Sequence, residues 1–358
     1  MANISIIGGG SWGLAMTHLL KKNHHNIRVW EYNSENVQKL QNERANEVYL
    51  KGVVFDEDII FTSDIKEAVN KDTEILVFAI PSVYMRQTVK MLTPPLAPPI
   101  NVVGVLPPTS TEANSGTTWG KLQAVVSLVK GLEEGSLKRM SEVLTEELPS
   151  YLKDKICSLS GPSHAEEVAK SIPTLVVVAG KNHNTLEYVQ KMFSNQVFRV
   201  YASKDIVGVE IGAAVKNIIS IAAGVVSGLG YGDNTMGALL TRGLAEIKRL
   251  GLALNADPET FSGLSGLGDL VTTAISPHSR NRYVGFQLGK GKKLEEITKE
   301  MVMIAEGVIT TKNIRDLKEK LNITMPITEE MYQLLYKGKD PKKALSDLMR
   351  RELKSSEM

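Results

Sequence analysis

The chain has almost no cysteine, little net charge and no long uninterrupted apolar run, and each absence excludes a class of protein. Cys157 is the single cysteine among 358 residues, so the chain has no internal disulfide framework, which suits a reducing compartment. Lysine and arginine number 42 against 40 acidic residues, a formal net charge of +2. Such a balance argues against a broad basic surface, so we expect neither nucleic acid nor a membrane as partner.

The apolar stretches are also too short or too interrupted for a membrane span. The longest, residues 211–226, contains Lys216 and Asn217. No basic segment precedes the first apolar run, so we expect no signal peptide and a cytoplasmic protein.

Two different periodicities divide the chain into two predicted domains. Over residues 1–203, short apolar runs alternate with helical patterns, which predicts βαβ units and a doubly wound sheet. Over residues 204–358, strand patterns disappear and helical patterns follow one another, which predicts an all-α domain. The expected strands are 4–7, 27–30, 59–62, 75–79, 124–128, 156–159, 175–179 and 198–201. The expected helices are 34–43, 65–69, 83–92, 137–148, 164–169, 184–193, 205–228, 235–250, 257–263, 282–289, 294–301, 307–320, 328–336 and 341–350.

One segment, residues 93–121, fits neither pattern. It carries six prolines and a stretch rich in Thr, Ser and Gly, a composition that does not pack as a helix or a central strand. We expect a surface insertion in the first domain.

The glycines after the first strand predict a dinucleotide site. Gly8, Gly10 and Gly13 have the spacing in which the first glycine allows a tight turn, the second lets a pyrophosphate approach the backbone and the third packs helix on strand. The helix N-terminus that follows attracts phosphate. Glu31 ends the second strand, where an acid that binds ribose is expected. A plain tight turn has the same letters, but this strand–turn–helix context favours nucleotide binding.

Lys216 is the candidate acid/base. It stands in an apolar helix, 205–228, where burial lowers the pKa of an ammonium group and suits it to proton transfer in carbonyl reduction. The alternative is a lysine that reaches the surface or pairs with a carboxylate. Asp269, in a glycine-rich turn, is a candidate partner, although an isolated aspartate there is more often a helix cap.

Further cations predict an anionic substrate. Lys130 follows a buried strand and therefore lies at the carboxyl edge of the sheet, where ligands bind. Arg280 offers a guanidinium that can hold phosphate by two hydrogen bonds, although charged loops are commonly just solvated. A phosphorylated small molecule is the simplest substrate for such a site.

Eight stretches resemble those of the NAD(P)-dependent glycerol-3-phosphate dehydrogenases, in family order and over nearly the whole chain. They are Gly8-Gly9-Gly10-Ser11-Trp12-Gly13, Ala79-Ile80-Pro81-Ser82, Lys130-Gly131-Leu132-Glu133, Ser160-Gly161-Pro162-Ser163-His164-Ala165, Val215-Lys216-Asn217, Gly266-Leu267-Gly268-Asp269-Leu270, Ser279-Arg280-Asn281-Arg282 and Ala305-Glu306-Gly307. The chain departs from the family between Leu92 and Ala124, where members run more directly into the next strand.

The resemblance implies a Rossmann-type α/β domain, an all-α domain like that of 6-phosphogluconate dehydrogenase, and a site between them. It implies reversible conversion of dihydroxyacetone phosphate, a phosphorylated triose, to sn-glycerol 3-phosphate for glycerophospholipid synthesis, by a homodimer that uses NAD or NADP and no metal. The implied catalytic residues are Lys216, Asp269 and Lys130. The implied substrate ligands are Lys130, Gly161, Ser163, Lys216, Asn217, Asp269, Thr273, Ser279, Arg280 and Asn281. The cofactor contacts are Gly8, Gly10, Ser11, Trp12, Gly13, Glu31, Tyr32, Tyr49, Pro81, Lys130, Ala165, Arg280, Ile304 and Glu306.

Two alternatives and one preference complete the prediction. The alternatives are a two-domain dehydrogenase for a hydroxy acid or sugar acid, and a non-catalytic dinucleotide sensor. We predict a preference for NADH, because the Glu31 carboxylate accepts hydrogen bonds from the 2′-hydroxyl of NAD and repels the 2′-phosphate of NADP.

Overall fold

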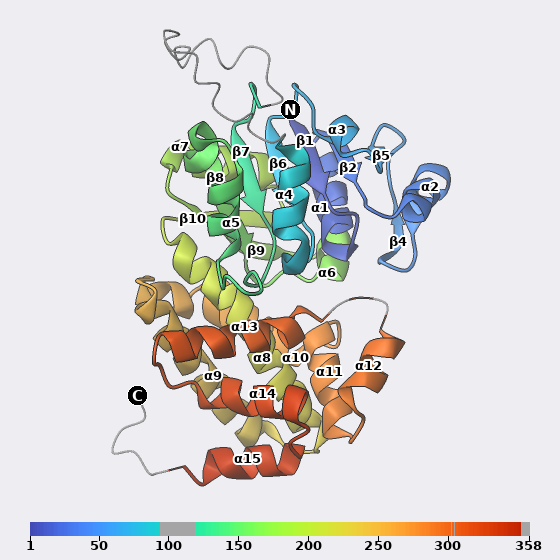
Figure 1. The fold of residues 1–358 in the computed structure, drawn as a ribbon. Helices are drawn as coiled ribbons and strands as arrows, with labels where there is room; N and C mark the ends of the chain where they lie inside the picture. The colour runs from blue at the N-terminus through green and yellow to red at the C-terminus, as the bar shows by residue number, and fades with distance from the viewer. Residues whose placement is uncertain (94–118, 302, 304, 352–358) are drawn as a thin grey trace.

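A computed structural model describes residues 1–93, 119–301, 303 and 305–351. It has the predicted class of fold: a sheet domain with helices on both faces, followed by a helical domain (Figure 1). The predicted boundary at residues 203–204 falls between the last strand and the first long helix. Most of the proline-rich segment, residues 94–118, lies outside the described residues, but Trp119 at its end is buried beside Leu122.

The sheet has eight strands in the order β10-β9-β8-β7-β6-β1-β2-β5. Their bounds match the eight predicted strands closely: β1 Asn3–Ile7, β2 Asn26–Trp30, β5 Ile60–Thr62, β6 Ile75–Phe78, β7 Ala124–Ser127, β8 Ile156–Ser160, β9 Thr174–Gly180 and β10 Phe198–Ser203. Neighbouring strands are parallel except β8 and β9. The connection between these two contains only the five-residue helix α6, Ala165–Ala169. Since that helix is about 7.5 Å long, it does not run back along the sheet, and β9 returns antiparallel.

Alternate residues of the central strands pack on opposite faces of the sheet. The helices of this domain are α1 Ser11–Lys22, α2 Ser34–Glu43, α3 Ile65–Ala68, α4 Met85–Leu92, α5 Met140–Glu147, α6 and α7 His183–Phe193. Ile4 and Val77 belong to the cluster with α1 and α7, whereas Ile7 and Phe78 belong to the cluster with α4 and α5. An unpredicted hairpin, β3 Ala45–Asn46 and β4 Leu50–Val54, follows α2.

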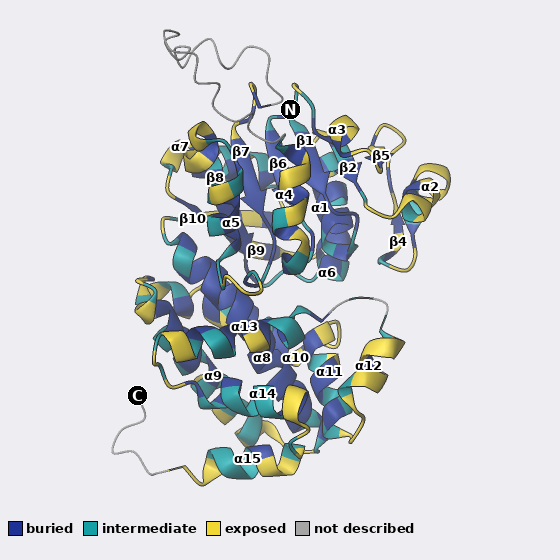
Figure 2. Cartoon of the chain, in the orientation of Figure 1, coloured by how far each residue is buried: buried dark blue, intermediate teal, exposed yellow. Residues whose placement is uncertain are grey.

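The helical domain is built around α8, Ile206–Gly228, which Figure 2 shows buried along its length. Around it lie α9 Asp233–Ala253, α10 Asp269–Ile275, α11 Arg280–Gly289, α12 Leu294–Glu300, α13 Glu306–Lys320, α14 Pro326–Lys337 and α15 Pro341–Met349. Among the described helices, α8 alone is long and apolar enough to cross a membrane, and 94% of its apolar window is buried in the domain. A core helix passes the same test of length and composition.

The structure specifies the form of two local elements in this domain. The helical stretch predicted over residues 257–263 is a short 3₁₀ helix, Pro258–Ser262, which begins with Asp257 as its N-cap and Pro258 in its first turn. The glycine-rich turn before Asp269 is π-helical, Leu264–Gly268, and leads directly into α10. Gly266 explains the tight packing, since a Cβ there would lie 2.2 Å from the Phe261 carbonyl oxygen.

Candidate active site

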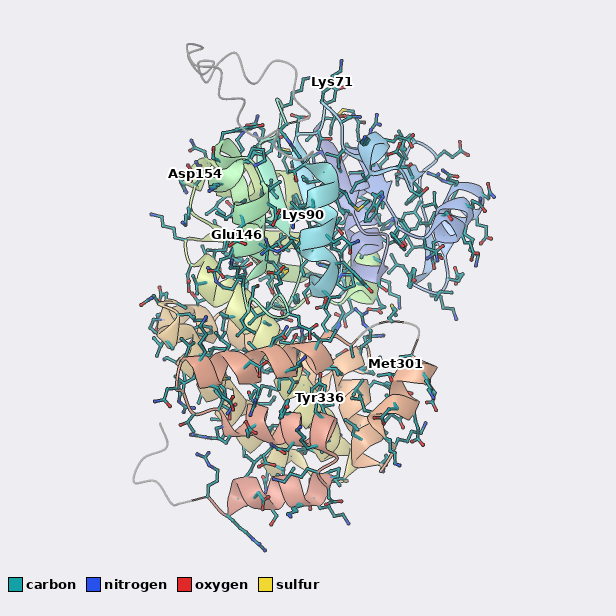
Figure 3. All side chains as sticks on the ribbon, in the orientation of Figure 1. Lys71, Lys90, Glu146, Asp154, Met301 and Tyr336 are labelled. Carbon is teal, nitrogen blue, oxygen red and sulfur yellow. The ribbon has the colours of Figure 1, made fainter. Side chains whose placement is uncertain are left out.

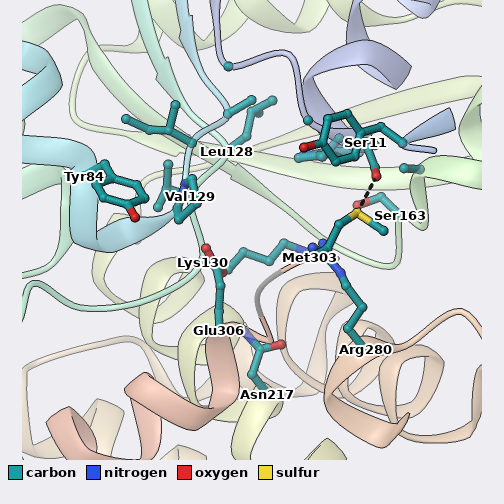
Figure 4. A pocket seen from close by; sticks show the side chains of 18 of the residues that line it. Ser11, Tyr84, Leu128, Val129, Lys130, Ser163, Asn217, Arg280, Met303 and Glu306 are labelled. Carbon is teal, nitrogen blue, oxygen red and sulfur yellow. Dashed lines mark hydrogen bonds between the residues drawn. The ribbon is translucent and has the colours of Figure 1, made fainter. Parts of the chain in front are cut away.

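A cavity of about 640 Å³ lies between the two domains, and nearly all of the predicted site residues line it. Figure 4 shows residues of the sheet domain, such as Ser11 and Leu128, on one side and Asn217 and Arg280 of the helical domain on the other. The predicted residues in the lining are Gly8, Gly10, Ser11, Trp12, Glu31, Tyr32, Tyr49, Pro81, Lys130, Ser163, Ala165, Lys216, Asn217, Asp269, Thr273, Ser279, Arg280, Asn281 and Glu306. Gly13 and Gly161 are not among the lining residues, and Ile304 is outside the described residues.

The three glycines of the first turn have the geometry that a pyrophosphate site requires. Gly8 has φ +117°, and a Cβ there would lie 2.5 Å from the Ala79 carbonyl oxygen. A Cβ on Gly13 would lie 1.9 Å from the Gly8 carbonyl oxygen, so helix and strand touch here. Gly10 precedes the first residue of α1 and has no atom within 4 Å of its Cβ direction. The helix N-terminus is therefore open to a phosphate.

Two polar groups near this turn also fit a dinucleotide. Both Glu31 carboxylate oxygens accept backbone N–H groups, from Gly9 at 2.9 Å and Asn33 at 3.0 Å. These bonds fix the carboxylate in the cavity wall and leave lone pairs for a ribose hydroxyl. The buried Trp12 Nε1 has no hydrogen-bond partner among the described residues, which is costly unless a ligand supplies one.

Asp269 lies between two lysines at the base of the cavity. Its Oδ1 is 2.8 Å from Lys216 Nζ, and its Oδ2 is 2.9 Å from Lys130 Nζ. The hydroxyl of Thr273, one turn along α10, accepts from Lys216 Nζ at 2.6 Å and donates to Asp269 at 3.1 Å. Ser160 Oγ donates to Asp269 from β8 at 3.3 Å. Asp269, the candidate partner of Lys216, is therefore in direct contact with it.

Burial and charge tune this cluster. Lys216 is only 4% exposed, and burial, with Lys130 adding repulsion, lowers the pKa of its ammonium to about 8 even though Asp269 opposes the shift. Burial would raise the pKa of Asp269, but Lys130 and Lys216 together hold it below its usual value. The cluster therefore combines an ionised carboxylate with a lysine that can exchange a proton near neutral pH.

The start of α11 forms a second polar region. Ser279 caps the helix by accepting the Arg282 N–H at 3.2 Å, and Arg280 faces the cavity (Figure 4). The Asn281 amide donates to Asn217 Oδ1 at 3.0 Å and accepts the Gly307 N–H at 2.9 Å. Asn281, predicted as a substrate ligand, thus also holds Asn217 and the start of α13 in place.

Several lining residues were not predicted. His164 and His278 face each other from the two domains with ring centroids 6.1 Å apart, and burial with the charge of Lys216 lowers the pKa of His164. Met303 accepts a hydrogen bond from Ser11 at 3.1 Å (Figure 4). In the sequence, only His164 could have been predicted as a lining residue, because it directly follows the predicted site residue Ser163. His278 and Met303 line the cavity because of the way the two domains pack together.

Glu306 closes the cavity from the first turn of α13. Burial raises the pKa of its carboxyl to about 7, against the opposing charge of Arg280.

Within the described residues, no group of three or more His, Cys, Asp or Glu side chains is arranged to hold a metal ion.

Comparisons with known proteins agree over both domains. The models for the N-terminal and C-terminal parts of NAD-dependent glycerol-3-phosphate dehydrogenase match residues 3–186 and 205–346. The glycerol-3-phosphate dehydrogenase [NAD(P)+] of Geobacillus thermodenitrificans is 45% identical, covering 98% of this chain and 95% of the relative. That of Pediococcus pentosaceus is also 45% identical, covering 98% of each chain. A crystal structure of glycerol-3-phosphate dehydrogenase from Coxiella burnetii superposes with a TM-score of 0.86 at 32% identity, covering 98% of this chain and 99% of that one.

Proposed function

Because the chain belongs to the NAD-dependent glycerol-3-phosphate dehydrogenase family and is an NAD(P)-dependent oxidoreductase, we propose that its cavity interconverts dihydroxyacetone phosphate and sn-glycerol 3-phosphate. The observation that carries this proposal is the buried cluster in which Lys216 and Lys130 share Asp269, at 2.8 Å and 2.9 Å. The cluster opens into the same cavity as the glycine turn. This shared cavity supports the proposal that a proton donor and a cofactor site act together.

In the direction of reduction, Lys216 donates the proton. A nicotinamide cofactor held at the glycine turn would supply the hydride that the carbonyl carbon needs. Lys216 transfers its proton to the carbonyl oxygen, so that C=O becomes CH–OH, and then recovers a proton from solvent. With a pKa of about 8, Lys216 is largely protonated at pH 7 and still acidic enough to react. Asp269 orients the ammonium, and the charge of Lys130 stabilises negative charge developing on oxygen.

Arg280 and the N-terminus of α11 bind the substrate phosphate in this proposal. The guanidinium lines the cavity, and the first turn of the helix points backbone N–H groups and the positive end of its dipole the same way. Anchoring the phosphate fixes the carbonyl against the cofactor, and correct placement of this kind contributes about 7–11 kcal/mol to catalysis.

The test is the oxidation of NADH or NADPH by dihydroxyacetone phosphate, followed at the absorbance of the reduced cofactor. Unphosphorylated dihydroxyacetone and carboxylated ketones serve as matched comparison substrates. Equal catalytic efficiency with and without the phosphate would refute the phosphate anchor. The matched family gives no support to the hydroxy-acid dehydrogenase or to the non-catalytic sensor.

Further features are proposed from the family resemblance and from Glu31. We place the enzyme in the cytoplasm as a homodimer that supplies glycerophospholipid synthesis and acts without a membrane. NADH is the preferred cofactor, because Glu31 at the ribose position disfavours a 2′-phosphate. Light scattering measures the oligomer, and a higher kcat/KM with NADPH than with NADH would contradict the cofactor preference.

A further inference from the structure

A small hairpin, residues 132–139, begins two residues after Lys130 and leads into α5. Its base is an antiparallel bridge between Leu132 and Arg139, and the Glu133 N–H donates to the Lys138 carbonyl at 2.9 Å. We call it the Lys130 hairpin. Since only Gly131 separates Lys130 from its base, the position of the hairpin governs where the Lys130 ammonium lies.

The first strand of the hairpin is held by the helical domain. The Asn313 amide on α13 donates to the Leu132 carbonyl at 3.0 Å, and Asn313 is only 1% exposed. The Leu132 side chain is buried in the hydrophobic cluster of the helical domain, with Val215 and Ile218 of α8. Lys130 follows a strand of the sheet domain, yet the chain just beyond it packs with the other domain.

The second strand is held by α8. Glu210 is 4% exposed, and its carboxylate accepts hydrogen bonds from the Ser141 N–H at 2.8 Å, the Ser141 hydroxyl at 2.5 Å and the Arg139 guanidinium at 2.7 Å. Glu210 thereby holds the end of the hairpin and the first turn of α5 against the helix that carries Lys216.

The body of the hairpin is bound by both domains. From the helical domain, Lys312 on α13 binds Glu134 at 2.8 Å. Arg86 on α4 binds Glu133 through two hydrogen bonds of 2.6 Å and 2.8 Å, and also Glu146 of α5, labelled in Figure 3. The two ties at the base therefore come from the helical domain, and those on Glu133 come from the sheet domain.

We infer that Asn313 and Glu210 are positioning residues through which the helical domain sets Lys130 against Asp269. The inference rests on the catalytic role proposed for Lys130. Neither side chain lines the cavity, so each acts through the hairpin. The proposed reaction requires Lys130 and Lys216 to lie at a fixed separation. The contacts that Asn313 and Glu210 make with the hairpin come from the helical domain, which also supplies Lys216 and Asp269.

The test uses Asn313→Leu, which keeps the size of the side chain and removes the donor, and Glu210→Gln, which weakens the contact with Arg139. The matched control is Glu246→Gln. Glu246 is an equally buried carboxylate of the helical domain that accepts the Ile327 and Thr328 N–H groups at 2.6 Å and 3.1 Å, and it does not line the cavity.

We measure kcat, KM, melting temperature and the pH profile of kcat/KM for reduction. A misplacement of about 1 Å can cost about 10²-fold in rate, so both hairpin variants should lose about 10- to 10²-fold in kcat/KM.

The pH profile depends on the charged groups around Lys216, which interacts with Asp269, Lys130, His164 and Glu306. Moving Lys130 away removes a repulsive charge, so the basic limb of the profile should shift to higher pH. Glu246→Gln should lower the melting temperature without moving the limb.

A double-mutant cycle separates the positioning role inferred for Asn313 from the catalytic role proposed for Lys130. Adding Asn313→Leu to Lys130→Met should cause little further loss in kcat/KM if Asn313 acts through Lys130. If the hairpin variants lower only the melting temperature and keep the parent pH profile, the positioning role is overturned while the role of Lys130 stands. If Lys130→Met keeps parent activity, the catalytic proposal itself fails.

Discussion

At the scale of single residues, a buried lysine is tolerated because its environment is complementary. Lys216 lies on an apolar helix and is nearly inaccessible to water, and an unpaired ammonium there would be strongly unfavourable. Asp269 and Thr273 satisfy it at 2.8 Å and 2.6 Å. Burial still lowers its pKa to about 8, so that at pH 7 the lysine is mostly charged but loses its proton more readily than an exposed lysine.

Lys216→Ala should lower kcat by about 10²-fold or more, the usual contribution of a positioned acid. Cofactor binding, measured by quenching of tryptophan fluorescence, should stay at the parent level because the glycine turn belongs to the other domain. Near-normal turnover in this variant would show that Lys216 is a structural residue.

Asp269→Asn should move the basic limb of the kcat/KM profile for reduction to lower pH. The Asp269 carboxylate raises the pKa of Lys216, opposing burial, so removing its charge lets the pKa fall below about 8. The proton donor is then lost at a lower pH, and residual activity should peak in more acidic buffer. A limb that stays in place would mean that Asp269 does not act on Lys216.

At the scale of secondary-structure elements, close contact between helices places the polar groups of the site. α8 and α11 pack so tightly that a Cβ on Gly285 would lie 1.8 Å from the Ile221 carbonyl oxygen. This crossing brings the first turn of α11, with Arg280 and Asn281, beside Asn217. The π-helical turn Leu264–Gly268 likewise positions Asp269, because it continues directly into α10, of which Asp269 is the first residue.

Gly285→Ala should therefore destabilise the protein, by about 1–3 kcal/mol in the free energy of unfolding, as overpacking typically does. The matched control is Gly237→Ala on α9, where a Cβ meets nothing within 4 Å. That variant should stabilise the helix by about 0.5–1 kcal/mol because alanine restricts the unfolded chain. Urea unfolding measures both, and equal effects from the two substitutions would contradict the packing argument.

At the scale of the whole molecule, two hydrophobic cores meet at one cavity. The sheet supplies the glycine turn and Glu31, and the helical domain supplies Lys216, Asp269 and Arg280. Lys130 joins the two, since it follows β7 and binds Asp269 on α10. The reaction site exists only when both domains hold their relative positions.

Saturating NADH should raise the melting temperature, because a ligand that binds only the folded cavity stabilises it by about 2.7 kcal/mol at 100 times its Kd. Glycerol 3-phosphate together with NAD⁺ should raise it further, since the substrate bridges groups of the helical domain and the cofactor. Thermal unfolding followed by circular dichroism measures both shifts. No shift with either cofactor would contradict the cavity as the binding site.

The sequence by itself determined the periodic elements and the chemical groups of the site. Short-range sequence patterns were enough to predict strand β1, its glycine turn and the helix that follows, because these elements depend mainly on residues close together in the chain. A lysine within the largely apolar α8 likewise indicated a buried ionisable group before its partner was known. The short β3–β4 hairpin was missed because its strands lack a clear alternation, and the antiparallel β9 because direction depends on the length of a connection in space.

Only the tertiary structure decided which groups meet. Lys130 and Asp269 are 139 residues apart, and Lys216 and Asp269 are 53 apart. Local patterns carry no information about such distances, since the contacts arise from the packing of α8, α10 and the sheet edge. The same packing lets Asn313 and Glu210 hold the Lys130 hairpin and brings His164 to His278. The sequence thus determined which residues have side chains suited to chemistry, and the meeting of the two hydrophobic cores determined which of them lie together in one cavity.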